Sequence, residues 1–126
     1  MNEHVQNLFS ANDFAQRVRH WTPDHDDLTG DHSLNPDFTQ SMVTAKMRDA
    51  AVLVPVVDRG PEATLLLTRR TEKLRKHSGQ IAFPGGAIDP EDGTAENAAL
   101  REANEEIGLV SDRAEIIGHM PRYLTG

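Results

Sequence analysis

The chain has 126 residues, 37% of them hydrophobic, and a formal net charge of −7. This length allows one domain with a modest core. The excess of negative charge repels polyanions, so we expect no nucleic-acid partner. Cysteine is absent, which excludes disulfides, thiolate nucleophiles and zinc–sulfur sites. The N-terminus has no signal-peptide pattern, and no segment approaches the roughly 18 to 20 apolar residues that cross a bilayer. We therefore expect a cytoplasmic protein with no membrane partner.

The character of the sequence changes near residue 45, which predicts an N-terminal extension over residues 1–45 and a domain over residues 46–126. Residues 24–37 of the extension are acidic and rich in turn-forming residues, as expected of a loop. His25 and His32 lie among the aspartates of this loop. A metal site is one interpretation of these histidines, and a solvated polar loop is the preferred one.

A helix is predicted before that loop. Ser10, with Asp13 three residues later, is typical of a helix N-terminus. Pro23 is predicted to end the helix. Apolar side chains recur at helical spacing at Phe14, Val18 and Trp21.

The middle of the chain has the pattern of strands. Residues 50–57 (AAVLVPVV) form a nearly continuous β-branched run, which predicts a strand covered on both faces. After a turn at residues 58–61, a second strand is predicted over residues 63–70. A third short strand is predicted over residues 80–83, where Pro84-Gly85-Gly86 ends it.

A second helix is predicted from Thr94 to Ile107, with Gly108 ending it in a left-handed conformation. Residues 114–120 (AEIIGHM) predict another strand. Because strands and helices interleave, the predicted class is α/β or α+β, with a mixed sheet packed against helices.

Three glutamates cluster in the second half of this helix. At about 100° per residue, Glu102, Glu105 and Glu106 fall within one arc. A separate arc that can face the core holds Leu100, Ala103 and Ile107. Mutual repulsion of the glutamates and the helix dipole oppose this arrangement. A divalent cation reverses both effects, because carboxylate oxygens are the preferred ligands of Mg²⁺ and Mn²⁺. The alternative is a solvated acidic face in which Arg101 pairs with Glu105.

A glycine pair, Gly85-Gly86, precedes the acidic helix. Glycine can take backbone angles barred to other residues. A glycine loop lets backbone amides approach a phosphate or orient a water near a metal. A tight turn is the simpler interpretation of the pair alone. Because Asp89, Asp92 and the glutamate helix follow, we interpret it as part of a functional site.

Residues 86–109 resemble the Nudix box, whose pattern is G-x5-E-x7-R-E-U-x-E-E-x-G-U with U an aliphatic residue. Gly86 matches the first glycine, and residues 101–109 (REANEEIGL) match the second half, with Ala103 in an aliphatic slot. The first acidic position is Asp92 rather than Glu, and eight residues separate it from Arg101 instead of seven. Both departures resemble the coenzyme A pyrophosphatase branch of the family.

An upstream motif resembles the same branch, L-L-T-x-R-[SA]-x3-R-x3-G-x3-F-P-G-G. The sequence from Leu66 to Gly86 matches it at every spacing, with Thr71 as the one mismatch. Residues 69–77 contain five basic residues against one acid, a local charge of +4. Because arginine clamps phosphates well, we predict that this segment binds a phosphorylated substrate. The residues proposed for this role are Arg69, Arg70 and Arg75. A solvated basic loop is the alternative.

The resemblance implies a Nudix-like fold and hydrolysis of the diphosphate of coenzyme A, giving 3′-phosphoadenosine 5′-phosphate and 4′-phosphopantetheine. It implies Mg²⁺ or Mn²⁺ as cofactor, with Glu102 and Glu106 as metal ligands and Glu105 as a third ligand or the base for water. Arg101 would orient the glutamates through a salt bridge. The backbone at Gly85 or Gly86 would bind substrate or supply a further metal ligand.

Two alternatives remain open. The substrate could be another nucleoside diphosphate derivative, such as ADP-ribose or NADH, or the chain could be an inactive Nudix-like binding module. The family domain usually continues well past the box, so we expect that a sequence ending at Gly126 is truncated. A homodimer is compatible with the sequence, as are several forms of coenzyme A.

Overall fold

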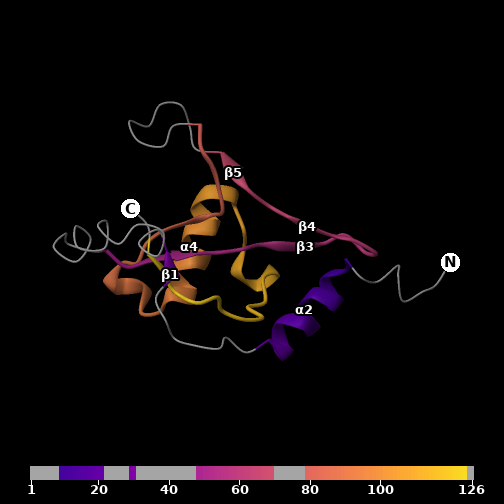
Figure 1. Ribbon diagram of the computed structural model, residues 1–126. Coiled ribbons are helices and arrows are strands. Elements are labelled where there is room, and N and C mark those ends of the chain that lie inside the picture. Colours follow the sequence, from indigo (N-terminus) through magenta and orange to yellow (C-terminus); the bar gives the residue numbers. More distant parts are fainter. Residues whose placement is uncertain (1–8, 22–28, 31–47, 70–78, 125–126) are drawn as a thin grey trace.

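A computed structural model describes residues 9–21, 29–30, 48–69 and 79–124 (Figure 1). The helices in these ranges are α2 (Ala11–His20) and α4 (Ala95–Ile107), with the 3-10 helices η2 (Pro90–Asp92) and η3 (Ser111–Arg113). The strands are β1 (Thr29–Gly30), β2 (Ala50–Val52), β3 (Val56–Asp58), β4 (Ala63–Leu65), β5 (Thr68–Arg69), β6 (Ile81–Ala82), β7 (Gly85–Ala87) and β8 (Tyr123–Leu124). Residues that carried predictions but lie outside the described ranges are Pro23, His25, His32, Arg70 and Arg75.

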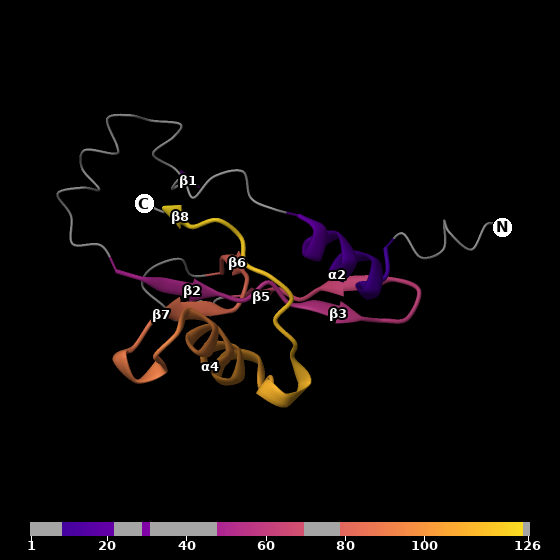
Figure 2. The ribbon, with the colours of Figure 1, turned by 90° about the horizontal axis from the view of Figure 1, so that it is seen from below.

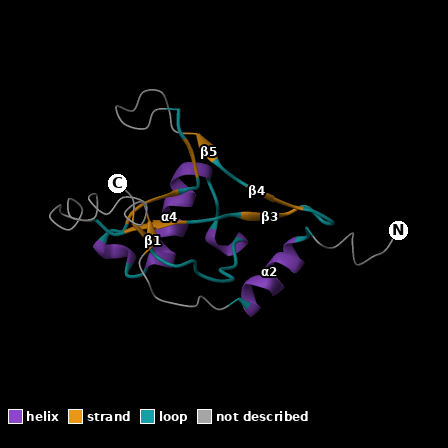
Figure 3. Cartoon of the chain, viewed as in Figure 1, coloured by secondary structure: helices purple, strands orange, loops and turns teal. Residues whose placement is uncertain are grey.

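The strands form four pairs rather than one continuous sheet among the described residues. Figure 3 distinguishes the helices, strands and loops by colour. β2–β7, β3–β4 and β5–β6 are antiparallel, and β1–β8 is parallel. Figure 2 shows α4 against β2 and β7, while α2 lies beside the β3–β4 hairpin. The predicted class, α/β (α+β) with helices packed on strands, is confirmed. Within the described part of the chain, no helix is long and apolar enough to cross a membrane.

The core lies where α4 packs on the β2–β7 pair. Its buried members are small, so the helix axis can approach the strands closely: Ala51, Ala98 and Ala99, with Leu53 and Ile88 packed against them. Ala103 is also buried. The arc predicted to face the core is therefore wrong in part, because Leu100 and Ile107 are only half-buried. The arc that does face the strands is the one that contains Glu102.

The limits of α4 are those predicted from its capping residues. The Thr94 hydroxyl accepts a hydrogen bond from the Asn97 N–H at 3.1 Å, which satisfies a donor at the helix start. At the other end Gly108 has φ +69°, and its N–H donates to the Asn104 carbonyl at 2.9 Å. This left-handed residue ends the helix without the steric penalty that a side chain would add.

The long strand predicted over residues 50–57 is divided into β2 and β3. Pro55 lies between them and has no N–H to donate to a neighbouring strand. The prediction that this run is covered on both faces is wrong, because Val52 is 58% exposed and Val54 is 37% exposed. The predicted strand over residues 63–70 is likewise two short strands, β4 and β5.

The turn predicted at residues 58–61 is confirmed as the connection of the β3–β4 hairpin. The Asp58 carboxylate accepts a hydrogen bond from the Gly60 N–H at 2.9 Å. Gly60 has φ +86°, a conformation that favours glycine. The flanking strands pair Val57 with Thr64.

The prediction that Pro84-Gly85-Gly86 ends a strand as a glycine loop is wrong. Gly85 and Gly86 form strand β7 and pair with Val52 and Ala51 of β2. Neither glycine has a positive φ angle. The pair is extended because it continues the ladder, in which the Leu53 N–H donates to the Pro84 carbonyl at 2.8 Å.

The strand predicted over residues 114–120 is also wrong, since this segment has no regular secondary structure. A strand needs a partner for its backbone groups, and no described strand pairs with this segment. It passes close to α2 instead, where a Cβ built on Gly118 would lie 2.5 Å from a methyl group of Val18. The next strand is β8, whose partner β1 lies within the predicted loop over residues 24–37.

Helix α2 begins as predicted. The Ser10 hydroxyl accepts a hydrogen bond from the Asp13 N–H at 3.1 Å, and the Asp13 carboxylate then pairs with Arg17 at 2.8 Å. The helix ends at His20, with Trp21 as its cap. The N-terminal segment is tied to the hairpin because the Ala63 N–H donates to the Phe9 carbonyl at 2.6 Å.

Candidate active site

Glu102 is the glutamate that faces the strands. It lies on the same side of α4 as Ala98 and Ala99, and its side chain is only 18% exposed. A Cβ built on Gly86 would lie 2.5 Å from a carboxylate oxygen of Glu102. A residue with a side chain at position 86 would therefore displace this carboxylate.

Glu105 and Glu106 occupy the last turn of α4, and both are exposed. Glu106 lies one helical turn beyond Glu102, on the arc that points toward the strands. Glu105 lies to the side of that arc, one turn beyond Arg101. Two of the three predicted ligands are thus presented along one line of the helix, with the third beside it.

Arg101 joins the helix to the segment that precedes it. Its Nε and Nη2 atoms donate to the two oxygens of Asp92 at 2.7 and 2.9 Å, which is a bidentate ion pair. Nη2 also donates to the Ala87 carbonyl at 3.1 Å. Nη1 lies 3.2 Å from Glu102 and 3.4 Å from Glu105. The predicted contact with Glu105 is present, but it is longer than the contacts with Asp92.

Asp92 is held by its own loop as well as by Arg101. Its carboxylate accepts a hydrogen bond from the Asp89 N–H at 2.8 Å, and its side chain is only 6% exposed. The hydrogen bonds from Arg101, followed by the one from the Asp89 backbone, hold the pKa of Asp92 below its usual value. Asp92 in turn raises the pKa of Arg101. We conclude that Asp92 is a structural partner of Arg101 in this site.

The pairing of Asp92 with Arg101 was not predicted from the sequence. The local signal was present, because Asp89-Pro90 followed by Asp92 forms a capping box at the start of η2. That signal predicts the shape of the loop. It does not predict that the loop folds back on Arg101, nine residues further along the chain.

The donor set suits a hard divalent cation, since carboxylate oxygens are the ligands that Mg²⁺ and Mn²⁺ prefer. The residues with this chemistry are Glu102, Glu105 and Glu106. In the ranges that the structure describes, no three acidic or histidine side chains converge closely enough to enclose a metal. Arg101 provides the positive charge next to Glu102 and Glu105. The glycine at position 86 leaves room beside Glu102, which fits a ligand approaching from the strand side.

Of the three predicted substrate-binding arginines, the described residues include Arg69. It is exposed on β5, where it pairs with Ile81 of β6. The Thr68 hydroxyl donates to the Ala82 carbonyl at 3.0 Å, which fastens this strand pair just before the basic segment. Arg69 therefore lies on a strand whose partner, β6, is followed in the chain by β7 and the candidate site.

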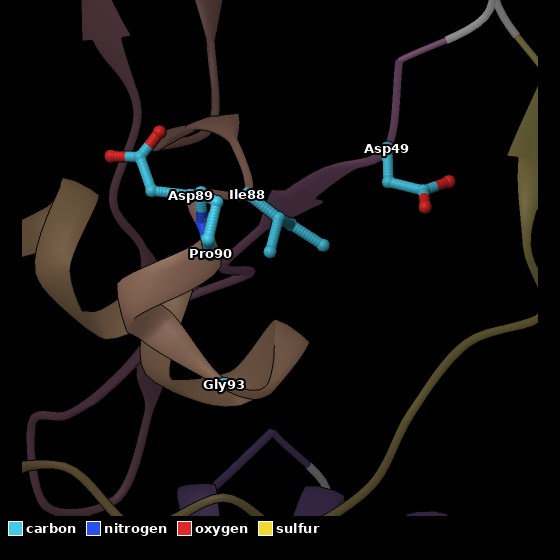
Figure 4. Close-up of a pocket in the computed structure, with 5 residues that line it drawn as sticks. All are labelled: Asp49, Ile88, Asp89, Pro90 and Gly93. Carbon is cyan, nitrogen blue, oxygen red and sulfur yellow. The ribbon is translucent and has the colours of Figure 1, made fainter.

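A shallow depression of about 260 Å³ lies beside the site, and Asp49 and Asp89 contribute to its lining. Figure 4 shows that their carboxylates point in different directions, with the Ile88 side chain between them. The Asp89 carboxylate lies 3.3 Å from Arg101. This depression therefore does not bring acidic groups together as a second metal site.

Comparison with known proteins identifies the family. The NUDIX domain model matches residues 47–126, which is more than half of the chain. The chain belongs to the Nudix family. The match includes β2, β7 and the whole of α4, so the glutamates, Arg101 and Gly86 all lie inside the family domain.

Several bacterial proteins named "Uncharacterized Nudix hydrolase NudL" are similar to this chain. The one from Cronobacter sakazakii is 51% identical over 88 residues, covering 70% of this chain and 44% of the relative. Those from Salmonella paratyphi B and Salmonella heidelberg are 49% identical over 100 residues, covering 75% of this chain and 50% of each relative. The chain thus spans about half the length of these relatives.

The names of these relatives describe them as Nudix hydrolases. Nudix hydrolases generally use divalent cations, which agrees with the carboxylate chemistry of α4.

Proposed function

We propose that this chain belongs to a hydrolase that cleaves the diphosphate of coenzyme A or a derivative, with Mg²⁺ or Mn²⁺ as cofactor. The products are 3′-phosphoadenosine 5′-phosphate and 4′-phosphopantetheine. The choice of coenzyme A within the family rests on the upstream motif from Leu66 to Gly86 and on Asp92 in the first acidic position of the box.

The roles of the glutamates follow from their places on α4. Glu102 and Glu106, one turn apart on the side that faces the strands, hold the cation. Glu105 is either a third ligand or the base that accepts a proton from the attacking water. When bound, the cation neutralises charge on the diphosphate and acts as a Lewis acid. Arg101 is a positioning residue that holds Glu102 and Glu105.

The substrate is held by cationic and backbone groups. Arg69, Arg70 and Arg75 bind phosphate groups, for which the guanidinium geometry is well suited. Gly86 brings the backbone of β7 close to Glu102. The backbone at Gly85 or Gly86 contacts either the substrate or the cation. A homodimer in the cytoplasm is part of the same proposal.

The observation that carries the proposal is the approach of Glu102 to Gly86. A half-buried carboxylate is costly unless a cation or a hydrogen-bond donor compensates for it. The absence of a side chain at position 86 makes room for that carboxylate beside β7, the strand that contains the last two residues of the upstream motif. An acidic face that serves solubility alone would point away from the strands.

The experiment is an assay of the chain with Mg²⁺ or Mn²⁺ and coenzyme A, its acyl esters, ADP-ribose and NADH, with identification of the products. Coenzyme A or an ester should give 3′-phosphoadenosine 5′-phosphate. In Glu106→Gln, we expect a loss of at least about 100-fold in kcat, the scale of removing a metal ligand or its support. Glu96→Gln, at the opposite end of α4, changes the same functional group and should retain activity.

Each outcome of the assay discriminates. Cleavage of ADP-ribose or NADH in preference to coenzyme A keeps the chemistry and rejects the substrate. If the wild type and both variants bind a substrate but none hydrolyses it, the chain is a non-catalytic binding module instead. Full metal-dependent activity in Glu106→Gln contradicts the assignment of Glu106 as a ligand.

A further inference from the structure

The Arg101 guanidinium has two unequal sets of contacts. Nε and Nη2 bind Asp92 at 2.7 and 2.9 Å, with both carboxylate oxygens engaged. Nη1 reaches Glu102 at 3.2 Å and both oxygens of Glu105 at 3.4 Å. One nitrogen is thus shared among three carboxylate oxygens at distances longer than those of a strong charge-assisted hydrogen bond.

The two sets of contacts also differ in how exposed their carboxylates are to solvent. The Asp92 side chain is 6% exposed, whereas the side chains that Nη1 contacts are more exposed, at 18% for Glu102 and 56% for Glu105. Solvent screens the exposed ion pair more strongly, so Nη1 is the more easily replaced part of the guanidinium. The contacts of Nη2 with the Ala87 carbonyl and of Nε with Asp92 keep the rest of it in place.

We propose that Arg101 is an internal counter-ion that holds Glu102 and Glu105 until a divalent cation displaces its Nη1 atom from them. Asp92 retains the guanidinium throughout, so the arginine shifts its Nη1 contacts without leaving the site. The inference rests on the proposed function, because it takes the glutamates as ligands. Two positive charges beside the same carboxylates repel each other, so Arg101 and the cation compete.

Because Arg101 and the cation compete, the proposal predicts whether loss of Arg101 raises or lowers the affinity for the cation. Arg101→Gln removes the competing charge, so Mn²⁺ should bind this variant more tightly, by about fivefold for an ion pair of roughly 1 kcal/mol. If Arg101 only supports the glutamates, Arg101→Gln should bind Mn²⁺ more weakly, because the glutamates would no longer be held in position. Arg17→Gln is the matched control, since Arg17 makes a 2.8 Å ion pair with Asp13 on α2, away from the candidate site. Its Mn²⁺ affinity should equal that of the wild type.

Titration calorimetry with Mn²⁺ measures these affinities on the full chain. If Arg101→Gln binds Mn²⁺ as weakly as the wild type or more weakly, the counter-ion role is rejected. If the wild type itself takes up no Mn²⁺, the proposed function fails before Arg101 is tested. The two failures are therefore distinct.

A second measurement needs no variant. In side-chain ¹H–¹⁵N spectra of the wild type, addition of Mg²⁺ should shift the Nη1 signals of Arg101 and leave the Nε–H that faces Asp92 nearly unchanged. Unchanged Nη1 signals at saturating Mg²⁺ would overturn the proposal. Loss of the Nε–H signal would overturn it too, because the guanidinium would then have left Asp92.

Discussion

Glycine at position 86 determines how closely Glu102 can lie to the strands. A Cβ at position 86 would lie 2.5 Å from the Glu102 carboxylate, which is the end of a flexible side chain and can move away. A Cβ at position 85 would lie 2.5 Å from the Ala51 carbonyl oxygen, which is a backbone atom and cannot move without shifting the strand. Neighbouring glycines therefore serve different purposes, one in the site and one in the fold.

This difference predicts two distinct alanine phenotypes. Gly86→Ala should lower Mn²⁺ affinity and activity by about tenfold or more, with a loss of stability below about 1 kcal/mol, because Glu102 can rotate away. Gly85→Ala should cost about 1 to 3 kcal/mol of unfolding free energy, because strands β2 and β7 must separate. Urea denaturation and calorimetry measure both quantities. Equal effects of the two changes on metal affinity would contradict the assignment.

Asp92 gives the stability of the chain a predictable pH dependence. Its pKa is lowered by Arg101, so the ion pair stabilises the fold fully above about pH 4. This contribution is lost as the pH falls through the lowered pKa. The difference in unfolding free energy between wild type and Asp92→Asn should therefore shrink as the pH falls below about 4. Urea denaturation at each pH measures it, and a constant difference would contradict the prediction.

At the scale of the element, α4 has two halves with different tasks. The first half packs Ala98 and Ala99 on β2 and β7, and the second half presents the glutamates. Because a helix is rigid over this length, the packing of the first half fixes the position of the glutamates in the second half. The charged half is unfavourable at a helix C-terminus, so the caps and the alanine contacts stabilise α4 in the absence of a cation.

The N-cap of α4 should therefore matter for stability. Thr94→Ala removes the acceptor of the Asn97 N–H and should cost about 1 kcal/mol of unfolding free energy. Thr94→Ser is the control, because it retains the hydroxyl and should stay within a few tenths of a kcal/mol of the wild type. Chemical denaturation of the three proteins tests this. A loss in the serine variant equal to that in alanine would show that the methyl group, rather than the cap, is responsible.

At the scale of the whole molecule, the described residues leave much apolar surface uncovered. Large hydrophobic side chains on the strands are more than half exposed, including Val52, Leu65 and Ile81. The buried side chains of the described residues, by contrast, are four alanines and Pro84. Exposed apolar surface of this kind favours association.

We predict that the chain self-associates as its concentration rises. Replacing Leu65 and Ile81 together with threonine gives both positions a β-branched residue suited to strands and removes apolar surface, so association should weaken by about tenfold or more. Sedimentation velocity over a concentration series measures this. The control is Thr64→Ser, on the neighbouring position of β4, which should not change association. Association that is unchanged by the double substitution would place the contact elsewhere.

Local patterns determined the parts of this protein that depend on near neighbours in the sequence. The helix from Thr94 to Gly108, the turn before Gly60 and the spacing of the three glutamates required no knowledge of distant residues. Caps, turns and helical periodicity act over four residues or fewer, so they are legible in the chain itself.

Only the tertiary structure decided which strands pair and which side of α4 faces them. Pro55 divides a run that looked like one strand, and Gly86 is extended because β2 pairs with it. The small side chains of Ala98 and Ala99, rather than Leu100, face the strands, and this rotation brings Glu102 to Gly86. Strand pairing and helix rotation depend on contacts between residues far apart in the chain, and these contacts also join Asp92 to Arg101.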